Sequence, residues 1–293
     1  QSFARLGSRV TLVDMAERLL PREDPEVSRH LVEVFRREGI DVRLGCKAER
    51  CEPLSGGAGV LVVDSGDGNV RLPFERILVA VGRRPETRSL GLEEVGVSLG
   101  PGGNVEVNAH MQTSVPGIYA CGDLVGPYQF THMASHQAWY AAVNALFGRF
   151  WKFSADYSVV PWATYTDPEV ARVGLSQAEA REKDIPVEVT TYAFDDLDRA
   201  VADGRTDGWI TVLTPPGKDQ ILGVTVVGSQ AAELLSEFVL AMTHGLGLKK
   251  LMSTIHVYPS RSEAAKLAAG AWRRAHAPER ALRWVGRLLS LLR

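Results

Sequence analysis

The chain has 293 residues, 45% of them hydrophobic, and a formal net charge of −2 at pH 7. That length suits one large domain or two ordinary ones, and the near-neutral charge gives no basis for a nucleic-acid-binding surface. Three cysteines cannot form a fully paired disulfide framework, and no apolar run reaches the ~18 residues of a membrane-spanning helix. We therefore expect a globular protein of the reducing cytoplasm.

The first residues, "QSFARLGSRVTLVD", begin in the middle of a pattern. Gly7 closes the end of a helix, and Val10 to Val13 form a short apolar run that ends in Asp14. Helix, glycine, strand and terminal acid are the second half of a dinucleotide-binding unit, in which the acid accepts hydrogen bonds from the adenosine ribose. Such an acid favours NAD, although nearby Arg18 keeps NADP possible; the alternative is a surface Asp after a core strand. The Gly-rich turn of this unit is missing, so we expect a fragment whose turn lies upstream of Gln1.

One helix and several strands follow. The stretch "DPEVSRHLVEVFRREG" predicts a helix with Asp24 as its N-cap, Pro25 in the first turn and Gly39 at its end. The stretches "GIDVRL", "GVLVVDS" and "NVRLPF" predict short strands, the last two joined by a "GDG" turn. The apolar run Ile77 to Val81 predicts a strand buried on both faces. It ends at Gly82, where backbone can come close to a ligand.

Two of the three cysteines, Cys46 and Cys51, lie in "CKAERC", at a spacing that a redox disulfide can use. The stretch falls between two predicted strands and itself reads as extended. Five residues of strand separate the two Cα atoms by about 16 Å at ~3.3 Å per residue, whereas a disulfide needs roughly 7 Å or less. There is also no helix start to lower a thiol pKa. We expect both cysteines to be bystanders.

The stretch "TSVPGIYACGDLVG", residues 113–126, predicts an apolar strand ending in Gly122 and Asp123. A glycine there lets backbone pass close to a cofactor, and the carboxylate can accept hydrogen bonds from a polyol; the alternative is a hairpin tip with a capping Asp. The whole stretch resembles the second flavin-binding motif of the pyridine nucleotide-disulfide oxidoreductases. The resemblance implies that Asp123 holds the ribityl chain of FAD, with Met133 and Ala134 of the following helix beside the flavin ring.

The resemblance extends over nearly the whole chain. "VAVGRRP" resembles the end of the NAD domain, and "TYTDPEVARVGLSQAEARE" the first strand and helix of the dimerisation domain, where Ser176 and Glu179 form a capping box. The implied fold class is α/β, with partial Rossmann-like FAD/NAD-binding domains followed by an α+β dimerisation domain. The implied division is an NAD(P)-binding domain over 1–112, the closing segment of the FAD domain over 113–150, the dimerisation domain over 151–275, and a basic amphipathic helix over 276–293.

The chain departs from the family where most members carry His-Pro-x-x-x-Glu, whose His serves disulfide exchange as acid and base. Here "HVYPSRSEAAKLAA" keeps Pro259 and Glu263 but has Tyr258 before the proline and His256 two residues earlier. Tyr, with a pKa near 10, is a poor base at pH 7 but can donate a proton or a hydrogen bond. Along a strand His256 and Tyr258 would share a face; packing at a dimer interface is the alternative role for both.

Mercuric reductases also resemble the chain in having Tyr in that region. Their vicinal C-terminal cysteines are absent here, so metal delivery by a dithiol tail is unsupported, and we expect no metal site. The tail after Pro278 instead combines an apolar helical face with a stripe of arginines. Such a helix can lie on an anionic membrane surface or pack on its own protein.

The resemblance implies an FAD-dependent NAD(P)H oxidoreductase of the disulfide reductase type, a homodimer that passes electrons to a disulfide or a related acceptor such as a metal ion. As a fragment, the chain should bind FAD weakly and be inactive alone. The alternatives are an NADH oxidase or quinone reductase of the same fold without a redox disulfide, and a non-catalytic dimerisation or partner-binding module. The candidate catalytic residues are Tyr258, Glu263 and His256, and the candidate cofactor-binding residues are Asp123, Gly122, Met133, Ala134, Asp14 and Gly82.

Overall fold

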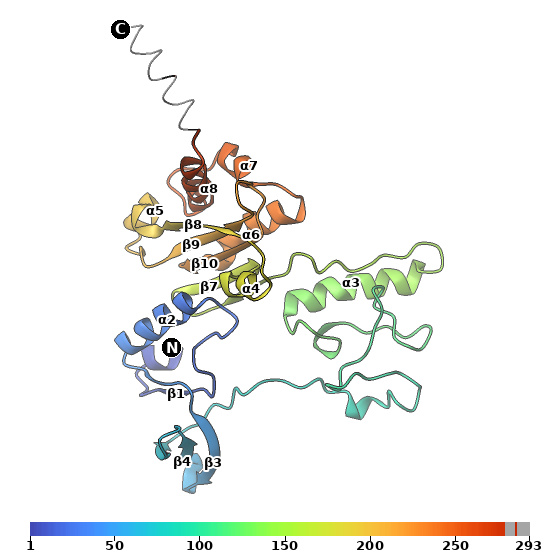
Figure 1. The fold of residues 1–293 in the computed structure, drawn as a ribbon. Coiled ribbons are helices and arrows are strands. Elements are labelled where there is room, and N and C mark those ends of the chain that lie inside the picture. The colour runs from blue at the N-terminus through green and yellow to red at the C-terminus, as the bar shows by residue number, and fades with distance from the viewer. Residues whose placement is uncertain (279–284, 286–293) are drawn as a thin grey trace. The chain divides into compact units, whose positions relative to one another are not determined.

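The structure is a computed structural model that describes residues 1–278 and Val285 (Figure 1). It contains two compact units. The first combines residues 1–77 with the chain from Ser158 onwards, and the second consists of Leu78 to Tyr157. Helices and strands alternate through most of the chain, which confirms the mixed α/β class.

The N-terminal part of the first unit is a small parallel α/β arrangement. Its elements are α1 (Ser2–Arg5), β1 (Thr11–Val13), α2 (Pro25–Arg37) and β2 (Asp41–Arg43). β1 and β2 pair in parallel with Leu12 opposite Val42, and Gly7 ends the first helix with a φ of +97°. The predicted order of helix, glycine, strand and acid is confirmed.

A three-stranded antiparallel sheet follows, built from β3 (Lys47–Pro53), β4 (Gly59–Asp64) and β5 (Asn69–Phe74), with a short 3-10 turn η1 (Ser55–Gly57). The hairpin of β4 and β5 is confirmed. Cys46 is buried before β3, Cys51 is exposed on it opposite Leu61, and both thiols are free. "CKAERC" is therefore a strand that carries two unpaired sulfurs, as expected.

The apolar run Ile77 to Val81 is not a strand, and this prediction is wrong. Leu78, Val79 and Val81 are 78%, 69% and 89% exposed. An extended segment becomes a strand only when a neighbouring strand satisfies its backbone groups, and none pairs with this run in the described part of the chain. Gly82 follows with a φ of +122°, and a Cβ added there would meet no protein atom within 4 Å.

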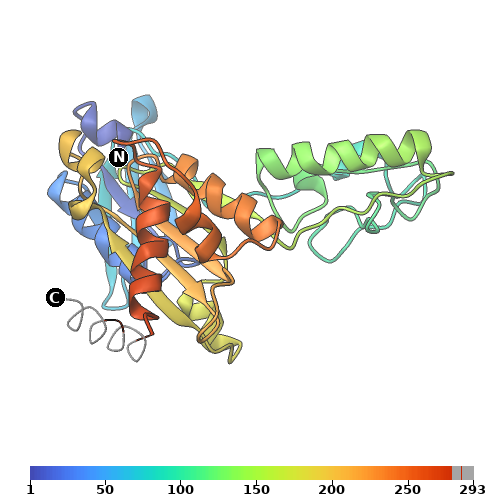
Figure 2. The ribbon, with the colours of Figure 1, turned by 90° about the horizontal axis from the view of Figure 1, so that it is seen from above.

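The second unit contains one long helix, α3 (Thr131–Phe147), which runs alongside extended chain of the same unit (Figure 2). Two short 3-10 turns precede it, η2 (Arg88–Leu90) and η3 (Gly122–Leu124). The strand predicted before Gly122 is only an isolated bridge between Gln112 and Tyr119. That prediction is corrected for the same reason as the run at 77–81: among the residues that the structure describes, no strand pairs with it to form a ladder.

The chain after Ser158 forms a five-stranded antiparallel sheet in the order β6-β7-β10-β9-β8. Its strands are β6 (Pro161–Thr164), β7 (Glu169–Gly174), β8 (Glu188–Ala193), β9 (Trp209–Thr214) and β10 (Gly223–Gly228). The connecting elements are α4 (Gln177–Glu182), η4 (Phe194–Asp196) and α5 (Asp198–Ala202), and the C-terminal helices are α6 (Ala231–Thr243), α7 (Leu248–Ser253) and α8 (Glu263–Ala275). The first strand and helix expected of the dimerisation domain are confirmed as β7 and α4.

Both faces of this sheet are covered within the first unit. α6 and α8 pack on one face, and α7 lies against α8 (Figure 1). On the other face, Val27, Leu31 and Phe35 of α2 share a core with Val170 and Val227 of the sheet. The N-terminal residues and the C-terminal sheet are therefore one packed body.

Asp24 joins these two parts in a way the sequence did not predict. It occupies the N-cap position of α2, but its side chain does not cap that helix. Instead its carboxylate accepts hydrogen bonds from the backbone N–H of Gln177 at 3.1 Å and of Ala178 at 2.9 Å, in the first turn of α4. The predicted capping box of α4, between Ser176 and Glu179, is confirmed. Helix α4 thus begins with its own capping box and with a second cap from a distant segment.

Four side chains close by, Glu23, Trp162, Arg172 and Glu179, form the Arg172 cluster, in which Glu23 and Arg172 are buried. Arg172 Nε is 2.9 Å from Glu23 Oε2 and Nη1 is 2.6 Å from Glu179 Oε2, while the guanidinium lies 4.3 Å from the centre of the Trp162 ring. Burial raises the pKa of Glu23, although the charge of Arg172 opposes it. Burial acts the same way on Glu179, but hydrogen bonds from Arg172 and from Ser176 N–H outweigh it and lower the pKa of Glu179.

The basic amphipathic helix predicted over 276–293 lies almost entirely outside the described residues. Within residues 1–278, no helix combines the length and hydropathy that crossing a bilayer requires.

Candidate functional site

The Gly122–Asp123 turn is the centre of the candidate flavin site. It forms η3, and Gly122 has a φ of +78° that side-chain-bearing residues rarely adopt. A Cβ added at Gly122 would lie 3.3 Å from Cβ of Ala134, in the first turn of α3. Only glycine brings the turn this close to the helix, so the structure brings Gly122, Asp123 and Ala134 together as expected.

Gln137 holds this turn in place, and sequence reasoning missed it. Its side chain is fully buried, its Oε1 accepts a 2.6 Å hydrogen bond from Gly122 N–H, and its Nε2 donates to the Tyr157 hydroxyl at 3.2 Å. One signal was available: Gln137 shares a helical face with Met133 and Ala141, which are also buried. A polar residue on such a face usually has a specific partner.

Asp123 is the exposed member of the turn. Its carboxylate is 45% exposed and lies 3.6 Å from Nη1 of Arg83, so it can accept further hydrogen bonds. Phe130, at the N-cap of α3, supplies no capping side chain. A turn without a Cβ and a half-exposed carboxylate beside a helix start fit a flavin with its ribityl chain. Met133 is only 4% exposed and belongs to the packing beneath this surface.

Asp14 stands at the carboxyl end of β1, as predicted. Its Oδ1 accepts a 2.9 Å hydrogen bond from Ala16 N–H, and its own N–H donates to the Arg43 carbonyl at 3.0 Å. The second carboxylate oxygen has no partner among the described residues, so it can accept from a ribose hydroxyl. Arg18 does not approach this position, because its guanidinium donates to the Pro21 carbonyl at 2.9 Å.

Tyr258 pairs with an acid that the sequence did not single out. Its side chain is 67% exposed, and its hydroxyl donates to Oδ2 of Asp198 at 2.9 Å. This hydrogen bond, with the charge of Asp198, raises the pKa of Tyr258. Glu263 lies at the start of α8 and accepts from Ser260 N–H at 3.3 Å instead of binding the tyrosine.

His256 points away from Tyr258, contrary to the alternation expected of a strand. The segment 255–257 is not a strand, so no alternation applies. The His256 side chain is 6% exposed, and its Nε2 lies 2.9 and 3.0 Å from the two carboxylate oxygens of Glu237 in α6. Of the three candidate catalytic residues, the structure leaves Tyr258 as the exposed one.

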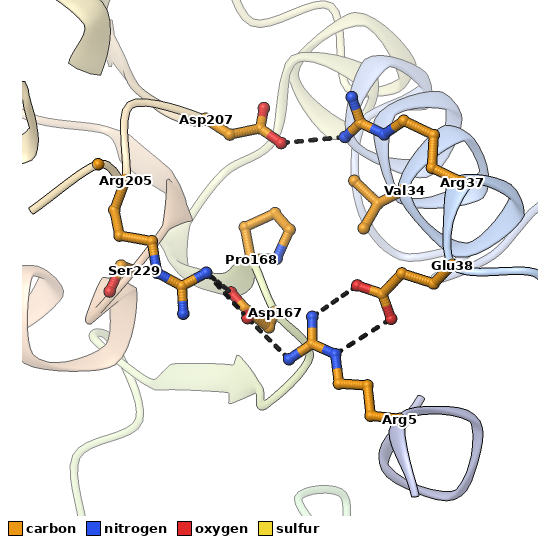
Figure 3. A pocket seen from close by; sticks show the side chains of 10 residues that line it. Arg5, Val34, Arg37, Glu38, Asp167, Pro168, Arg205, Asp207 and Ser229 are labelled. Atoms are coloured by element: carbon orange, nitrogen blue, oxygen red, sulfur yellow. Dashed lines mark hydrogen bonds and ion pairs between the residues drawn. The ribbon is translucent and has the colours of Figure 1, made fainter. Parts of the chain in front are cut away.

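A charged pocket of about 230 Å³ lies elsewhere on the first unit (Figure 3). Arg5 donates to both Glu38 and Asp167, and Arg205 Nη1 is 3.1 Å from Asp167 Oδ2. The hydrogen bond from Arg5 lowers the pKa of Glu38; for Asp167, bonds from Arg5 and Arg205 overcome the effect of burial and lower its pKa. The pocket is a network of paired charges, and none of the candidate residues lines it.

No group of three His, Cys, Asp or Glu side chains that could hold a metal ion occurs within the part of the chain that the structure describes.

An acid-ended βα unit, a Gly-Asp turn against a helix start and an α+β sheet region are features of the class of nucleotide-dependent flavoproteins. The chain belongs to the pyridine nucleotide-disulphide oxidoreductase family. The model of that family matches residues 1–138, and the model of its dimerisation domain matches residues 160–269. Members of this family are FAD-dependent and use NAD(P)H.

The similar curated proteins include dihydrolipoyl dehydrogenases and mercuric reductases. The dihydrolipoyl dehydrogenase of Thermus scotoductus is 41% identical over 92% of this chain and 58% of its own length. The mercuric reductase of Streptomyces lividans is 36% identical over 92% of this chain and 56% of its own. The chain therefore spans about half the length of the curated relatives that it matches.

The chain is also similar to solved structures. LpdA from Mycobacterium tuberculosis has a TM-score of 0.83 and 26% identity, over 92% of this chain and 57% of that one. The flavoprotein disulfide reductase RclA from Escherichia coli, which is induced by HOCl, has a TM-score of 0.81 and 28% identity, over 92% of this chain and 60% of that one.

Proposed function

We propose that this chain acts within an FAD-dependent NAD(P)H oxidoreductase of the disulfide reductase type, and that the enzyme is a homodimer. The observation that carries the proposal is the Gly122–Asp123 turn, packed against Ala134 in a chain of this family. When bound, FAD supplies hydride acceptance from the nicotinamide and electron transfer to a disulfide or a related acceptor such as a metal ion.

The residues around the turn would bind and orient the flavin. The carboxylate of Asp123 would accept hydrogen bonds from the ribityl hydroxyls, and Gly122 would keep backbone, with no side chain between, beside the cofactor. Ala134, with Met133 packed beneath, would place the start of α3 next to the ring system. Gln137 fixes the turn from below through its bond to Gly122 N–H.

Asp14 would select the nucleotide. Its free carboxylate oxygen suits a 2′-hydroxyl and repels a 2′-phosphate, because both the acid and the phosphate are negative. Arg18, the residue that could offset this repulsion, is bonded to Pro21. We infer that the enzyme prefers NADH.

Tyr258 would contact the electron acceptor or the redox disulfide in the active site of the partner protomer. It is exposed and stands directly before Pro259, at the position where most members of the family carry their acid–base residue. Its raised pKa keeps the phenol protonated at neutral pH, so it serves as a hydrogen-bonding group and not as a free base. Buried His256, held by Glu237, would position the loop.

The activity requires more polypeptide than these residues supply. The chain spans about half of its relatives' length, and its sequence contains no G-x-G-x-x-G. The test therefore uses the whole reading frame that encodes the chain, purified with its cofactor and titrated with NADH under anaerobic conditions.

Three outcomes are distinct. A flavoprotein that takes up two electrons beyond those of its flavin is a dithiol enzyme, as proposed. Uptake by the flavin alone would move the assignment to an NADH oxidase or quinone reductase of the same fold. A dimer that holds no flavin under any condition would contradict the proposal and favour a binding module.

A further inference from the structure

We call residues 254–262 the Tyr258 loop. Three acidic side chains from outside the loop bind it and hold it in place. His256 bonds to Glu237 in α6, Tyr258 to Asp198 in α5, and Arg261 Nη2 to Asp203 Oδ2 at 2.9 Å. The first and third bonds involve side chains that are 6% exposed, so they anchor the loop. The Tyr258–Asp198 bond is the exposed one, where a substrate can reach it.

The packing of its neighbours holds Asp198 in place. It begins α5, next to Leu197, which is 1% exposed, and its helix buries Ala200 completely. Tyr192, in the adjacent strand β8, donates its hydroxyl to the Asp196 carbonyl at 2.9 Å and fixes the turn that leads into α5. The carboxylate of Asp198 is therefore held at one place relative to the sheet.

Few charged groups face the Tyr258 hydroxyl. They are Asp198 from α5 and Glu263 from α8. The loop's other side chains that can carry a positive charge bind elsewhere: His256 binds Glu237 and Arg261 binds Asp203. Since Glu263 bonds to Ser260 N–H, Asp198 is the acid that sets the direction of the hydroxyl proton.

A phenol has one proton, and here it is donated to Asp198. The oxygen lone pairs are then free toward solvent, where they can accept a hydrogen bond from a thiol. Tyrosine is a poor base by itself, because accepting a proton would leave a phenol with two protons. A carboxylate behind it removes that obstacle, since it can take the first proton as the second arrives.

We propose that Tyr258 and Asp198 form a two-residue proton relay, in which Tyr258 contacts a substrate thiol and Asp198 positions the hydroxyl and takes up its proton. The inference rests on the proposed function. In one direction the thiol proton passes to the Tyr258 oxygen and the hydroxyl proton to the Asp198 carboxylate, leaving a thiolate and a neutral acid. In the other, the acid returns its proton through Tyr258 to a departing thiolate. Charge and protons balance in both directions.

The test uses the full-length, flavin-loaded enzyme with Asp198→Asn, Tyr258→Phe and a matched control, Asp195→Asn. Asp195 is a neighbouring acid in η4, and no hydrogen bond joins it to Tyr258. Three quantities are measured: rapid flavin reduction by NADH, the pH profile of dihydrolipoamide oxidation by NAD, and the ultraviolet titration of Tyr258, isolated as wild type minus Tyr258→Phe in each background.

The relay predicts that Asp198→Asn leaves flavin reduction by NADH unchanged and slows dihydrolipoamide oxidation by about 100-fold or more, the usual size of an acid–base contribution. It should also move the Tyr258 titration to lower pH, because the acceptor of its hydrogen bond is no longer charged. Asp195→Asn should change none of the three.

Unchanged dihydrolipoamide oxidation in Asp198→Asn, with Tyr258→Phe impaired, would overturn the relay and leave the proposed function standing. Normal oxidation in both variants would overturn it too. A wild-type protein that is not reduced by NADH would contradict the proposed function itself. The tyrosine titration would still show, independently of turnover, whether Asp198 governs the hydroxyl; an unshifted titration in Asp198→Asn would overturn the relay by itself.

Discussion

Arg172 and Glu23 face each other in the interior, with Nε 2.9 Å from Oε2 and side chains that are 1% and 5% exposed. Their geometry is that of an ion pair without a hydrogen bond between these two atoms. The arginine belongs to β7 and the acid precedes α2, so the pair fastens the N-terminal residues to the sheet.

Replacing Arg172 by Met should destabilise the first unit by about 3–5 kcal/mol, because Glu23 would remain buried without its counter-charge. The double variant Arg172→Met with Glu23→Gln should recover most of that loss, since the amide still accepts from Trp162 Nε1, now 2.8 Å from Glu23 Oε1. Equilibrium denaturation in urea measures both. A double variant no more stable than the single one would contradict this account of the cluster.

Asp24→Ala should lower the free energy of unfolding by about 1 kcal/mol. The loss should come from the N-terminus of α4 and not from α2, because the carboxylate accepts hydrogen bonds from Gln177 N–H and Ala178 N–H. Hydrogen exchange should therefore quicken at the first turn of α4. Glu33→Ala, which removes an exposed acid from the middle of α2, is the control and should leave α4 unchanged. Loss of protection confined to α2 would argue against this assignment.

Acid should destabilise the protein through Glu38 and Asp167. Their pKa values are lowered in the folded state, so the stability they contribute is present above their unfolded values of 4.5 and 3.8 and is lost as pH falls below them. Glu23, with its raised pKa, acts in the opposite sense, because its protonation favours the folded state. Melting temperatures between pH 6 and pH 3 should fall less steeply in Arg5→Met, which frees both lowered acids from Arg5. An identical slope would refute the assignment.

The substitution Gly122→Ala should make the whole enzyme lose most of its bound FAD. The added Cβ would press on Ala134 at 3.3 Å in a backbone conformation that alanine resists. Gly117→Ala is the matched control: its φ is +87°, so the backbone strain is similar, but a Cβ there meets nothing within 4 Å. The ratio of flavin to protein absorbance, read after gel filtration, compares the two. Equal FAD loss in both would show that strain, and not the close approach, matters.

Asp14→Ser should narrow the preference for NADH over NADPH by roughly tenfold, about the value of one charged contact. The change removes the repulsion of a 2′-phosphate while keeping a group that can bond to Ala16 N–H. The ratio of kcat/KM values for the two nucleotides is the measurement. A preference for NADPH in the unaltered enzyme would reverse the assignment of Asp14.

The sequence predicted those parts of the fold whose information is local. The helix ended by Gly39, the hairpin of β4 and β5 and the capping box of α4 depend on residues a few positions apart, and all are present. The Gly122–Asp123 turn was found because its pattern is long and specific. Its placement against Ala134 follows from the same glycine.

The errors come from partners distant in the chain. Ile77 to Val81 has the composition of a central strand, but composition cannot supply a neighbour to bond with. Asp24 has the position of a cap for its own helix, yet its carboxylate reaches Ala178, far along the chain. Asp198, the partner of Tyr258, is separated from it by sixty positions and follows no spacing rule.

The shared core of α2 and the five-stranded sheet has a consequence for biosynthesis. Val27, Leu31 and Phe35 are made before residues 78–157, but Val170 and Val227, against which they pack, are made only after them. Until then the apolar face of α2 lacks its partners from the five-stranded sheet. Nascent chains halted between these points should be the ones that chaperones bind and proteases cut, since folding of this body waits for its last strands.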